Sequence, residues 1–302
     1  MERGEIISKI ETRKDQLAET ISLQARFLRQ PLRAALFYFL IFCNRHTPLT
    51  FPVKTKTIWG SAIEAYESSA IGSVYFLGFY DIDVTLFLLK HQHATGDFVD
   101  IGSNIGYYAI LARELHELQG RIIAIEPTPS TFTTLKKNTE NYSEIVPIQA
   151  ALSESEGTTS FIDYGNRYAV FNSMKDHALP FLENKGTKID VKTMTLDALC
   201  DAHNLQPSIL KLDTEGTESK ILSGAGRTLA THAPIILLEV GGGEEWSKNN
   251  NDCLNTLITH DYSIFEATEN GSLIPHARQA TYDYKNLVCI PKSKIHRYVP
   301  NA

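Results

Sequence analysis

A short segment, VDIGSNIG at residues 99–106, places an acid and two glycines around a turn. Gly102 has no side chain, so a ligand can approach the backbone closely there, and Gly106 lets a following helix pack near the turn. Asn104 tolerates an unusual turn backbone, and Asp100 is expected to direct its carboxylate into the same crevice. Because purely structural turns share this pattern, the segment alone predicts a ligand site only weakly.

Glu126 strengthens that prediction. It lies 24 residues after Gly102, near the spacing of about 20 residues at which an acid binds ribose hydroxyls in nucleotide-binding folds. The alternative role is to cap the next helix, but the adjoining Pro127 and strand end favour a ligand. Since Asn104 replaces the middle glycine of the pyrophosphate-binding GxGxxG turn, the pattern favours a cofactor with an amino-acid tail over a dinucleotide.

A third segment, LKLDTEGTE at residues 210–218, holds three carboxylates within six residues. Asp213 and Glu215 are expected to reach the active crevice. Glu218 either joins them or stabilises the N-terminus of the next helix, where a negative charge contributes about 0.3–1 kcal/mol. Glu239, near the end of the apolar segment IILLEV, is a further candidate for acceptor binding or catalysis.

The elements expected around these residues alternate between strands and helices. Strands are predicted at 97–102, 121–125, 145–150, 208–212 and 234–240, with helices at 107–118, 129–141 and 217–230. A helix at 252–260 and strands at 262–267 and 286–291 follow, as a closing hairpin around Asn270-Gly271. This alternation predicts a parallel sheet with both faces covered. Ligands bind such sheets in the crevice at the carboxyl ends of the strands.

Together these segments resemble the FkbM family of methyltransferases. The resemblance rests on FVDIGSNIGYYAI, IAIEPTPSTFTTLKKN, AALSESEGTTSF, MTLDAL and ILKLDTEGTESKILSGA, preceded by GFYDID at 78–83, and it covers about residues 74–291. It implies an α/β fold of the class I, Rossmann-like methyltransferases. That fold has a seven-stranded, mostly parallel sheet with an antiparallel last strand and helices on both faces. The implied cofactor is S-adenosyl-L-methionine.

The resemblance also assigns roles to single residues. The methionine and ribose portion of the cofactor would be lined by Asp100, Gly102, Ser103, Asn104 and Gly106. Glu126 would bind the ribose, with Pro127 packed nearby. Ala151 and Leu152 would flank the adenine, and Tyr80 and Asp81 would close over the methionine end.

The implied reaction transfers a methyl group to a hydroxyl oxygen of a small molecule such as a saccharide, a glycolipid or a polyketide. Asp213 would lie beside the methyl group or the acceptor. An alcohol is a poor nucleophile, so a nearby base should accelerate transfer, typically by about 10²–10⁴-fold. The candidates are Asp213, Glu215 and Glu239, with Asp213 favoured. Mg²⁺ could bridge these carboxylates, although their spacing does not require a metal.

The acceptor pocket is expected to draw on the long segment 157–194. Its aromatic and amide side chains suit stacking on a sugar and hydrogen bonding to it: Tyr164, Asn166, Arg167, Tyr168, Phe171, Asn172 and Ser173. The same residues would also suit an ordinary hairpin with one half-buried face.

Two other function classes stay open at this point. A nicotinamide-dependent oxidoreductase would share the sheet, the glycine turn and the acid. It is disfavoured by the missing second glycine and by the lack of a plausible Tyr-x-x-x-Lys hydride relay. A non-catalytic, membrane-docked binding module on the same fold is the other alternative, although the intact cofactor positions weigh against it.

The first 69 residues differ in character from the catalytic domain expected over 70–302. A helical stripe within residues 1–30 is expected to dock on the main domain, and the most apolar run of the chain follows at 34–43. Ten residues are about half of a membrane-spanning helix. The run is therefore either a buried helix or a helix in a membrane interface, and four arginines surround it: Arg26, Arg29, Arg33 and Arg45.

Composition narrows the remaining possibilities. Of the 302 residues, 43% are hydrophobic and 21% charged, which is typical of a globular protein. The net charge of −6 argues against a nucleic-acid duplex as partner. Four scattered cysteines without a CxxC motif predict reduced thiols and a cytoplasmic protein. The sequence leaves open whether the protein associates with a membrane and whether it forms an oligomer. No zinc cluster is expected, and His91 and His93 are interpreted as a solvated helix end.

Overall fold

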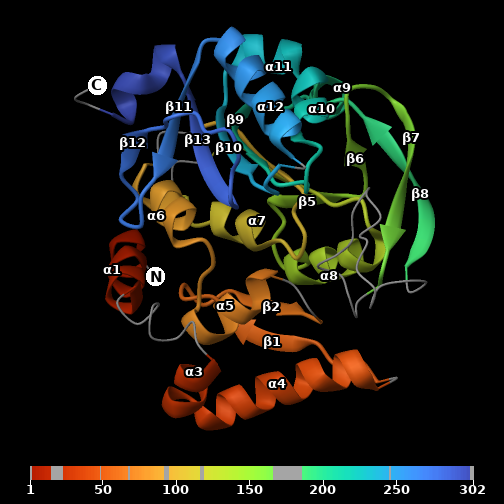
Figure 1. Cartoon of the computed structure of the whole chain (residues 1–302), viewed down its shortest axis with the longest axis vertical. Coiled ribbons are helices and arrows are strands. Elements are labelled where there is room, and N and C mark those ends of the chain that lie inside the picture. Colours follow the sequence, from red (N-terminus) through yellow and green to blue (C-terminus); the bar gives the residue numbers. More distant parts are fainter. Residues whose placement is uncertain are drawn as a thin grey trace.

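In a computed structural model of the chain, the described residues are 2–14, 23–47, 49–66, 69–91, 95–115, 119–165, 186–244 and 246–299. They form a central sheet with helices on both faces, and a further layer of helices and one hairpin lies beside it, at the bottom of Figure 1.

The central sheet has the strand order β12-β11-β13-β10-β9-β3-β4-β5. Its members are β3 (Asp97–Ile101), β4 (Ile122–Ile125), β5 (Ile145–Ile148), β9 (Pro207–Leu212), β10 (Ile235–Val240), β11 (Tyr262–Ala267), β12 (Leu273–Pro275) and β13 (Lys285–Pro291). The pairs from β5 through to β10 are parallel, and β13 runs antiparallel to both β10 and β11. The predicted seven-stranded sheet is confirmed, and the short β12 adds an eighth strand at one edge.

The strands read as unbroken apolar runs because both faces of the sheet are buried. Phe98 of β3 belongs to one hydrophobic core and its neighbour Val99 to the other. The first core is completed by α6 (Ile82–Lys90), α7 (Tyr107–Ala112) and α8 (Pro129–Thr139). The second is completed by α9 (Leu196–His203), α10 (Glu218–Ser223), α11 (Gly226–His232) and α12 (Ser247–Thr259).

Several boundaries differ from the sequence-based expectation. The predicted helix at 217–230 is two helices, α10 and α11, with a break at Gly224, where an added side chain would collide with the carbonyl of Ser153. The turn at Asn270-Gly271 joins β11 to β12, while β13 pairs with the other edge of β11. The predicted solvated helix end at His91 is half-buried, with Nε2 3.1 Å from the carbonyl oxygen of Gly271, and His93 lies outside the described residues.

A separate three-stranded sheet follows β5. It consists of β6 (Ala151–Leu152), β7 (Gly157–Asp163) and β8 (Thr187–Met194), in the order β6-β8-β7. The antiparallel pair of β7 and β8 is the hairpin foreseen as an alternative for residues 157–194. The acceptor residues predicted between the two strands, from Asn166 to Ser173, lie outside the described residues.

The N-terminal region contains the expected helices: α1 (Arg3–Lys14), α3 (Leu23–Arg29) and α4 (Pro31–His46). It also contains a hairpin that was not predicted, β1 (Val53–Lys56) with β2 (Ala62–Ala65), followed by α5 (Ser69–Leu77). A 3₁₀ helix, η3 (Lys292–Arg297), closes the described chain. Within the described ranges no single helix is long and apolar enough to cross a membrane. Two consecutive helical segments, Ala70–Leu77 and Ile82–Lys90, are together long and apolar enough for a membrane span, but they are bent by 70° relative to each other.

Candidate active site

A cavity of about 390 Å³ lies at the carboxyl ends of β3, β4, β9 and β10, where the alternating pattern placed it. Its volume is within the range of small-molecule sites. Most of the predicted site residues line it: Tyr80, Asp81, Gly102, Ser103, Asn104, Glu126, Pro127, Ala151, Leu152, Asp213, Glu215 and Glu239. Asp100 and Gly106 are the two predicted residues that do not.

The turn after β3 depends on its two glycines. Gly102 has a φ of +81°, and a side chain there would collide with the backbone carbonyl of Asp213. The close approach predicted at this position is thus made by the chain itself. Gly106, with a φ of +88°, immediately precedes α7, and an added Cβ would lie 2.8 Å from Leu135. It therefore permits the helix packing that the sequence suggested.

Asp100 is buried, binds a residue of this turn and does not line the cavity. It is 1% exposed and accepts a 2.6 Å hydrogen bond from Ser103 Oγ. Burial raises the pKa of its carboxyl to about 6. The expectation that it directs its carboxylate into the crevice is corrected accordingly, because the side chain lies on the buried strand β3 and is used to hold Ser103.

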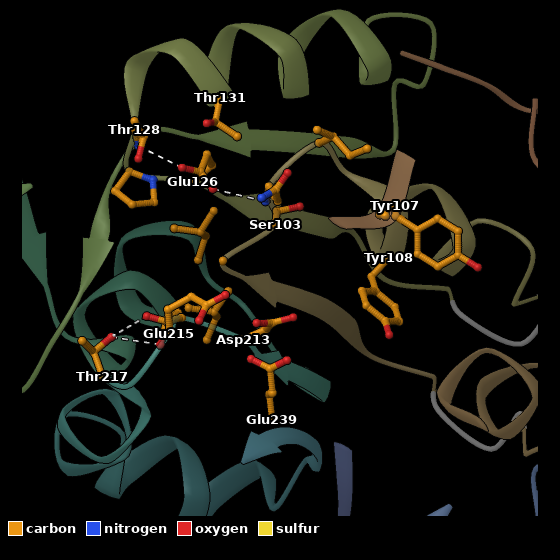
Figure 2. A pocket seen from close by; sticks show the side chains of 18 of the residues that line it. Ser103, Tyr107, Tyr108, Glu126, Thr128, Thr131, Asp213, Glu215, Thr217 and Glu239 are labelled. Atoms are coloured by element: carbon orange, nitrogen blue, oxygen red, sulfur yellow. Dashed lines mark hydrogen bonds between the residues drawn. The ribbon is translucent and has the colours of Figure 1, made fainter. Parts of the chain in front are cut away.

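Glu126 joins the ends of two strands. Its carboxylate accepts hydrogen bonds from the backbone amides of Asn104 (3.2 Å) and Thr128 (2.9 Å), and Figure 2 shows Glu126 beside Thr128. Burial raises the pKa of Glu126 to about 7. The capping alternative is confirmed, because Glu126 satisfies the amide of Thr128 at the start of α8. Glu126 also lines the cavity, and ribose binding by it stays a prediction. Among the described residues the side-chain oxygen of Asn104 is buried without a hydrogen-bond partner, which leaves it available to a ligand donor.

Across the cavity, Asp213, Glu215 and Glu239 form a carboxylate cluster (Figure 2). Ligand oxygens from the three residues lie within 4.8 Å of one another. The cluster exists because Asp213 and Glu215 follow β9 while Glu239 lies in the neighbouring parallel strand β10. Their spacing would allow a divalent cation to bind, although close carboxylates also occur without one.

Lys211 is a residue of this site that the sequence analysis missed. It is fully buried in β9, with Nζ 3.1 Å from Asp213 Oδ2 and 5.1 Å from the centre of the Tyr108 ring. Burial opposes its charge, but the charge of Asp213 is chief among the effects that outweigh burial, and the hydrogen bond to Asp213 acts in the same direction, so the pKa of Lys211 is raised. The available signal was a single lysine within an otherwise apolar strand.

The three carboxyls differ in protonation. Despite burial, Lys211 and a hydrogen bond from Glu239 lower the pKa of Asp213. Burial and the charge of Asp213 raise the pKa of Glu239 far above its usual range. The pair therefore holds one proton, on Glu239. Burial, followed by the charges of Asp213 and Glu218, raises the pKa of Glu215 to about 7. Glu215 also has a left-handed backbone, with a φ of +58°.

Glu218 lies in the first turn of α10, as its structural alternative predicts, but its carboxylate binds the preceding turn. Its carboxylate accepts hydrogen bonds from the amide and hydroxyl of Thr214, at 2.8 and 2.9 Å, and from Asn249 Nδ2 at 2.8 Å. It is 1% exposed and does not line the cavity. Glu218 therefore fixes the turn that carries Asp213 and Glu215.

Tyr80 and Asp81 are held in place by the helix that follows the glycine turn. Tyr108 donates a 2.6 Å hydrogen bond to Asp81 Oδ2, and Asn286 Nδ2 lies 3.1 Å from the same oxygen. The amide of Tyr80 donates to the Tyr107 hydroxyl at 3.0 Å. Burial raises the pKa of Asp81. Tyr107, Tyr108 and Asn286 were not predicted as site residues.

The opposite end of the cavity is mainly apolar. Ala151 and Leu152 of β6 and Phe161 of β7 line it, next to Pro127 and Thr128. This end suits a flat heterocycle, as expected for adenine. Tyr164, predicted to contact the acceptor, is buried and is absent from the described lining residues.

The chain matches a family model described as the Methyltransferase FkbM domain over residues 100–280. Two curated relatives are similar in sequence. The hexuronic acid methyltransferase AglP of Haloferax volcanii is 26% identical over 169 residues, 53% of this chain and 62% of the relative. Methyltransferase 1 of Beauveria bassiana is 33% identical over 143 residues, 42% of this chain and 57% of the relative. The chain thus spans about three fifths of the length of each.

Solved structures give more distant likenesses. Methyltransferase FkbM from Methylobacillus flagellatus has a TM-score of 0.43 at 18% identity, covering 65% of this chain and 43% of that one. Fibrillarin from Aeropyrum pernix, a structure with natively bound S-adenosyl-L-methionine, has a TM-score of 0.40 at 13% identity, covering 80% of this chain and 100% of its own. The family match covers more than half of the present chain. This protein belongs to the FkbM methyltransferase family.

Proposed function

We propose that the enzyme methylates a hydroxyl oxygen of a sugar-like small molecule. The observation that carries the proposal is the carboxylate cluster, in which one group, Glu215, has a pKa raised to about 7 beside an ionised Asp213. A group of that pKa is suited to accept a proton at neutral pH. The Haloferax relative is a hexuronic acid methyltransferase, which supports a saccharide as acceptor.

The residues present fit the cofactor. The unpartnered Asn104 oxygen and the Glu126 carboxylate offer acceptors for its amino and ribose hydroxyl groups. Ala151 and Leu152 provide the apolar wall that adenine needs. When bound, S-adenosyl-L-methionine supplies an electrophilic methyl group on a sulfonium.

Proton transfer would then involve the cluster. The sequence favoured Asp213 as base, but its pairing with Lys211 lowers its pKa and weakens it as a base. Glu239 already holds a proton. We assign the base to Glu215, which would take the acceptor's hydroxyl proton onto a carboxylate oxygen. Asp213, held by Lys211, would orient the hydroxyl. Alignment of the reacting atoms contributes further, since good positioning can be worth about 7–11 kcal/mol.

The rim of the cavity offers groups for a polyhydroxylated acceptor. Tyr284 is 63% exposed, lines the cavity and presents an aromatic ring against which a sugar could stack. Lys285 and Asn286 line the same wall as polar neighbours. An aromatic face beside polar side chains is the combination that the sequence predicts for residues 157–194.

The test is methyl transfer from labelled S-adenosyl-L-methionine to a panel of free sugars, uronic acids and sugar conjugates, with the product linkage determined by NMR. We expect an O-methyl ether on a sugar hydroxyl, formed by the wild-type enzyme and at most about 1% as fast by Glu215→Gln. Methylation confined to nitrogen, carbon or carboxylate acceptors would refute the proposal. The exposed Glu244→Gln substitution provides a matched control that should leave the rate unchanged.

A further inference from the structure

Charge is distributed unevenly along the chain. Residues 20–63 contain no aspartate or glutamate, although the whole protein carries a net charge of −6. The same 44 residues contain six lysines and arginines: Arg26, Arg29, Arg33, Arg45, Lys54 and Lys56. This segment is therefore strongly basic within an acidic protein.

The same segment carries most of the exposed apolar surface. Of the eleven large hydrophobic side chains exposed among the described residues, eight lie between residues 27 and 51: Phe27, Leu28, Leu32, Leu36, Phe39, Phe42, Leu49 and Phe51. Leu28 and Leu32 are 84% and 87% exposed. We name the four of them that lie on α4, Leu32, Leu36, Phe39 and Phe42, the outer apolar face. The four on α4 recur every three or four residues, so they form one stripe along the helix.

The outer apolar face cannot turn inward, because the opposite side of α4 is already packed. Ala34 and Phe37 are buried there, and the Phe37 ring lies 5.1 Å from the rings of both Tyr75 and Phe76 of α5. Asn44 fixes the end of the helix with hydrogen bonds to the carbonyls of Phe51 and Tyr66, at 2.8 and 3.0 Å. Figure 1 shows α4 as the outermost element of the N-terminal layer. The sequence alternative of a wholly buried helix is therefore wrong for this side of α4.

We propose that α3 and α4 dock the enzyme on an anionic membrane surface. Arg29 of α3, Arg45 in the last turn of α4 and Lys56 of β1 are exposed in the same segment, whereas Lys54 pairs with Glu64 at 3.6 Å. An apolar stripe on a helix together with flanking cations is typical of interfacial helices. The 16 residues of α4 extend about 24 Å, which is suited to lying in the interface. A second copy of the chain would fit less well. Its own α3 and α4 would bring a second Arg29 and Arg45 against the first pair, with no acid between residues 20 and 63 to pair with them.

The docking surface is linked to the active site through one helix. Ala70 at the start of α5 lines the cavity, and Tyr75 and Phe76 later in α5 contact Phe37 of α4. In a docked enzyme, α5 would thus connect the docking helix α4 to the wall of the cavity. Docking does not depend on the identity of the acceptor, so the two proposals can fail separately.

Flotation of the full chain with vesicles tests the apolar contribution. We expect the protein to float with vesicles of phosphatidylcholine and phosphatidylglycerol, and far less with phosphatidylcholine alone. The triple substitution Leu32→Ser, Leu36→Ser, Phe39→Ser should lower the partition coefficient at least about tenfold. The matched control is Ile258→Ser, Ile274→Ser, two side chains that are 50% and 48% exposed elsewhere. It should float like the wild type.

A second series tests the charge contribution. Arg29→Gln, Arg45→Gln, Lys56→Gln should weaken binding to anionic vesicles by about fivefold for each charge removed. The control Lys188→Gln, Lys192→Gln removes exposed lysines of β8 and should have no effect. Added salt should weaken wild-type binding, because the attraction is screened.

Thermal melting of each variant with S-adenosylhomocysteine establishes that it is folded. Failure of the folded wild type to float with anionic vesicles would overturn the proposal, as would flotation unchanged by the triple serine substitution. Light scattering tests the alternative occupant of this face, which is a second copy of the chain. If the wild type is a dimer that the serine substitutions convert to a monomer, with vesicle binding unaffected, the outer apolar face is an interface between copies and the membrane proposal is wrong.

Discussion

Lys211 Nζ lies 3.1 Å from Asp213 Oδ2 at the centre of the sheet, where the lysine is fully buried. This pair sets the charge state of the carboxylate cluster. The lysine keeps Asp213 ionised, and the ionised Asp213 in turn keeps a proton on Glu239. The apolar strand that carries Lys211 therefore fixes the electrostatics of the active site as well as its position.

Replacing Lys211 by methionine should destabilise the protein strongly. The substitution leaves a carboxylate cluster without its buried counter-charge, and breaking a buried pair typically costs about 3–5 kcal/mol. Urea denaturation at neutral pH measures the change in the free energy of unfolding. The exposed Lys188→Met substitution should alter it by at most about 0.5 kcal/mol. Equal effects of the two substitutions would show that the pair contributes nothing to stability.

Glu215→Gln should lower kcat by about 10²–10⁴-fold and leave cofactor affinity unchanged, because a glutamine cannot accept the proton. The pKa of Glu215 is raised to about 7, so wild-type kcat should rise with pH through that value and level off above it. The variant's residual rate should lack this rise. If Asp213→Asn removes the rise and Glu215→Gln retains it, the base is Asp213, as the sequence first suggested.

Cofactor affinity should depend on pH through Glu126. Burial raises its pKa to about 7, so the carboxylate gains a proton as the pH falls below that value. A protonated acid loses acceptor capacity toward ribose hydroxyls, and affinity should therefore weaken from pH 8 to pH 6. Calorimetric titration with S-adenosylhomocysteine measures this. Glu126→Gln should bind about 10–100-fold more weakly at pH 8 and show little pH dependence. A wild-type affinity that is flat over the same range would contradict the assignment.

Asp100 should make the folded protein less stable as the pH rises from about 4 to about 6. Its pKa is raised by burial to about 6 in the folded state, so in that window the folded chain binds the proton that the unfolded chain has released. Stability contributed by the proton is present below the window and is lost across it, at up to about 1.4 kcal/mol per pH unit. Asp100→Asn removes this contribution. The difference in unfolding free energy between wild type and variant should therefore shift across the window, and a constant difference would exclude the raised pKa.

The parts of the site that the sequence predicted are those with local signals at strand ends. Gly102, Glu126 and Asp213 each follow an apolar strand, and parallel strands bring such positions together. Asn286 could not be found this way, since it contacts Asp81 across 205 residues of chain and comes from the antiparallel strand β13. Lys211 was overlooked because a lysine inside a strand is usually exposed, and only the neighbouring acids explain its burial.

The direction of a side chain was also beyond the sequence. Asp100 stands at the right position for a ligand contact, yet its carboxylate is taken by Ser103. Glu218 could have served the cavity, but the amide and hydroxyl of Thr214 and the amide of Asn249 engage it. In both cases hydrogen bonds formed only in the folded chain decide between roles that composition and spacing leave equal.

Gly102 and Asp213 meet backbone to backbone, with no room for a methyl group between them. The turn after β3 and the turn that carries Asp213 and Glu215 are therefore in direct main-chain contact. The separation of the two turns is then set by peptide geometry, which varies far less than side-chain rotamers do. A substitution at residue 102 would therefore displace the turn that carries Asp213 and Glu215. Both carboxylates would move although neither residue is itself replaced.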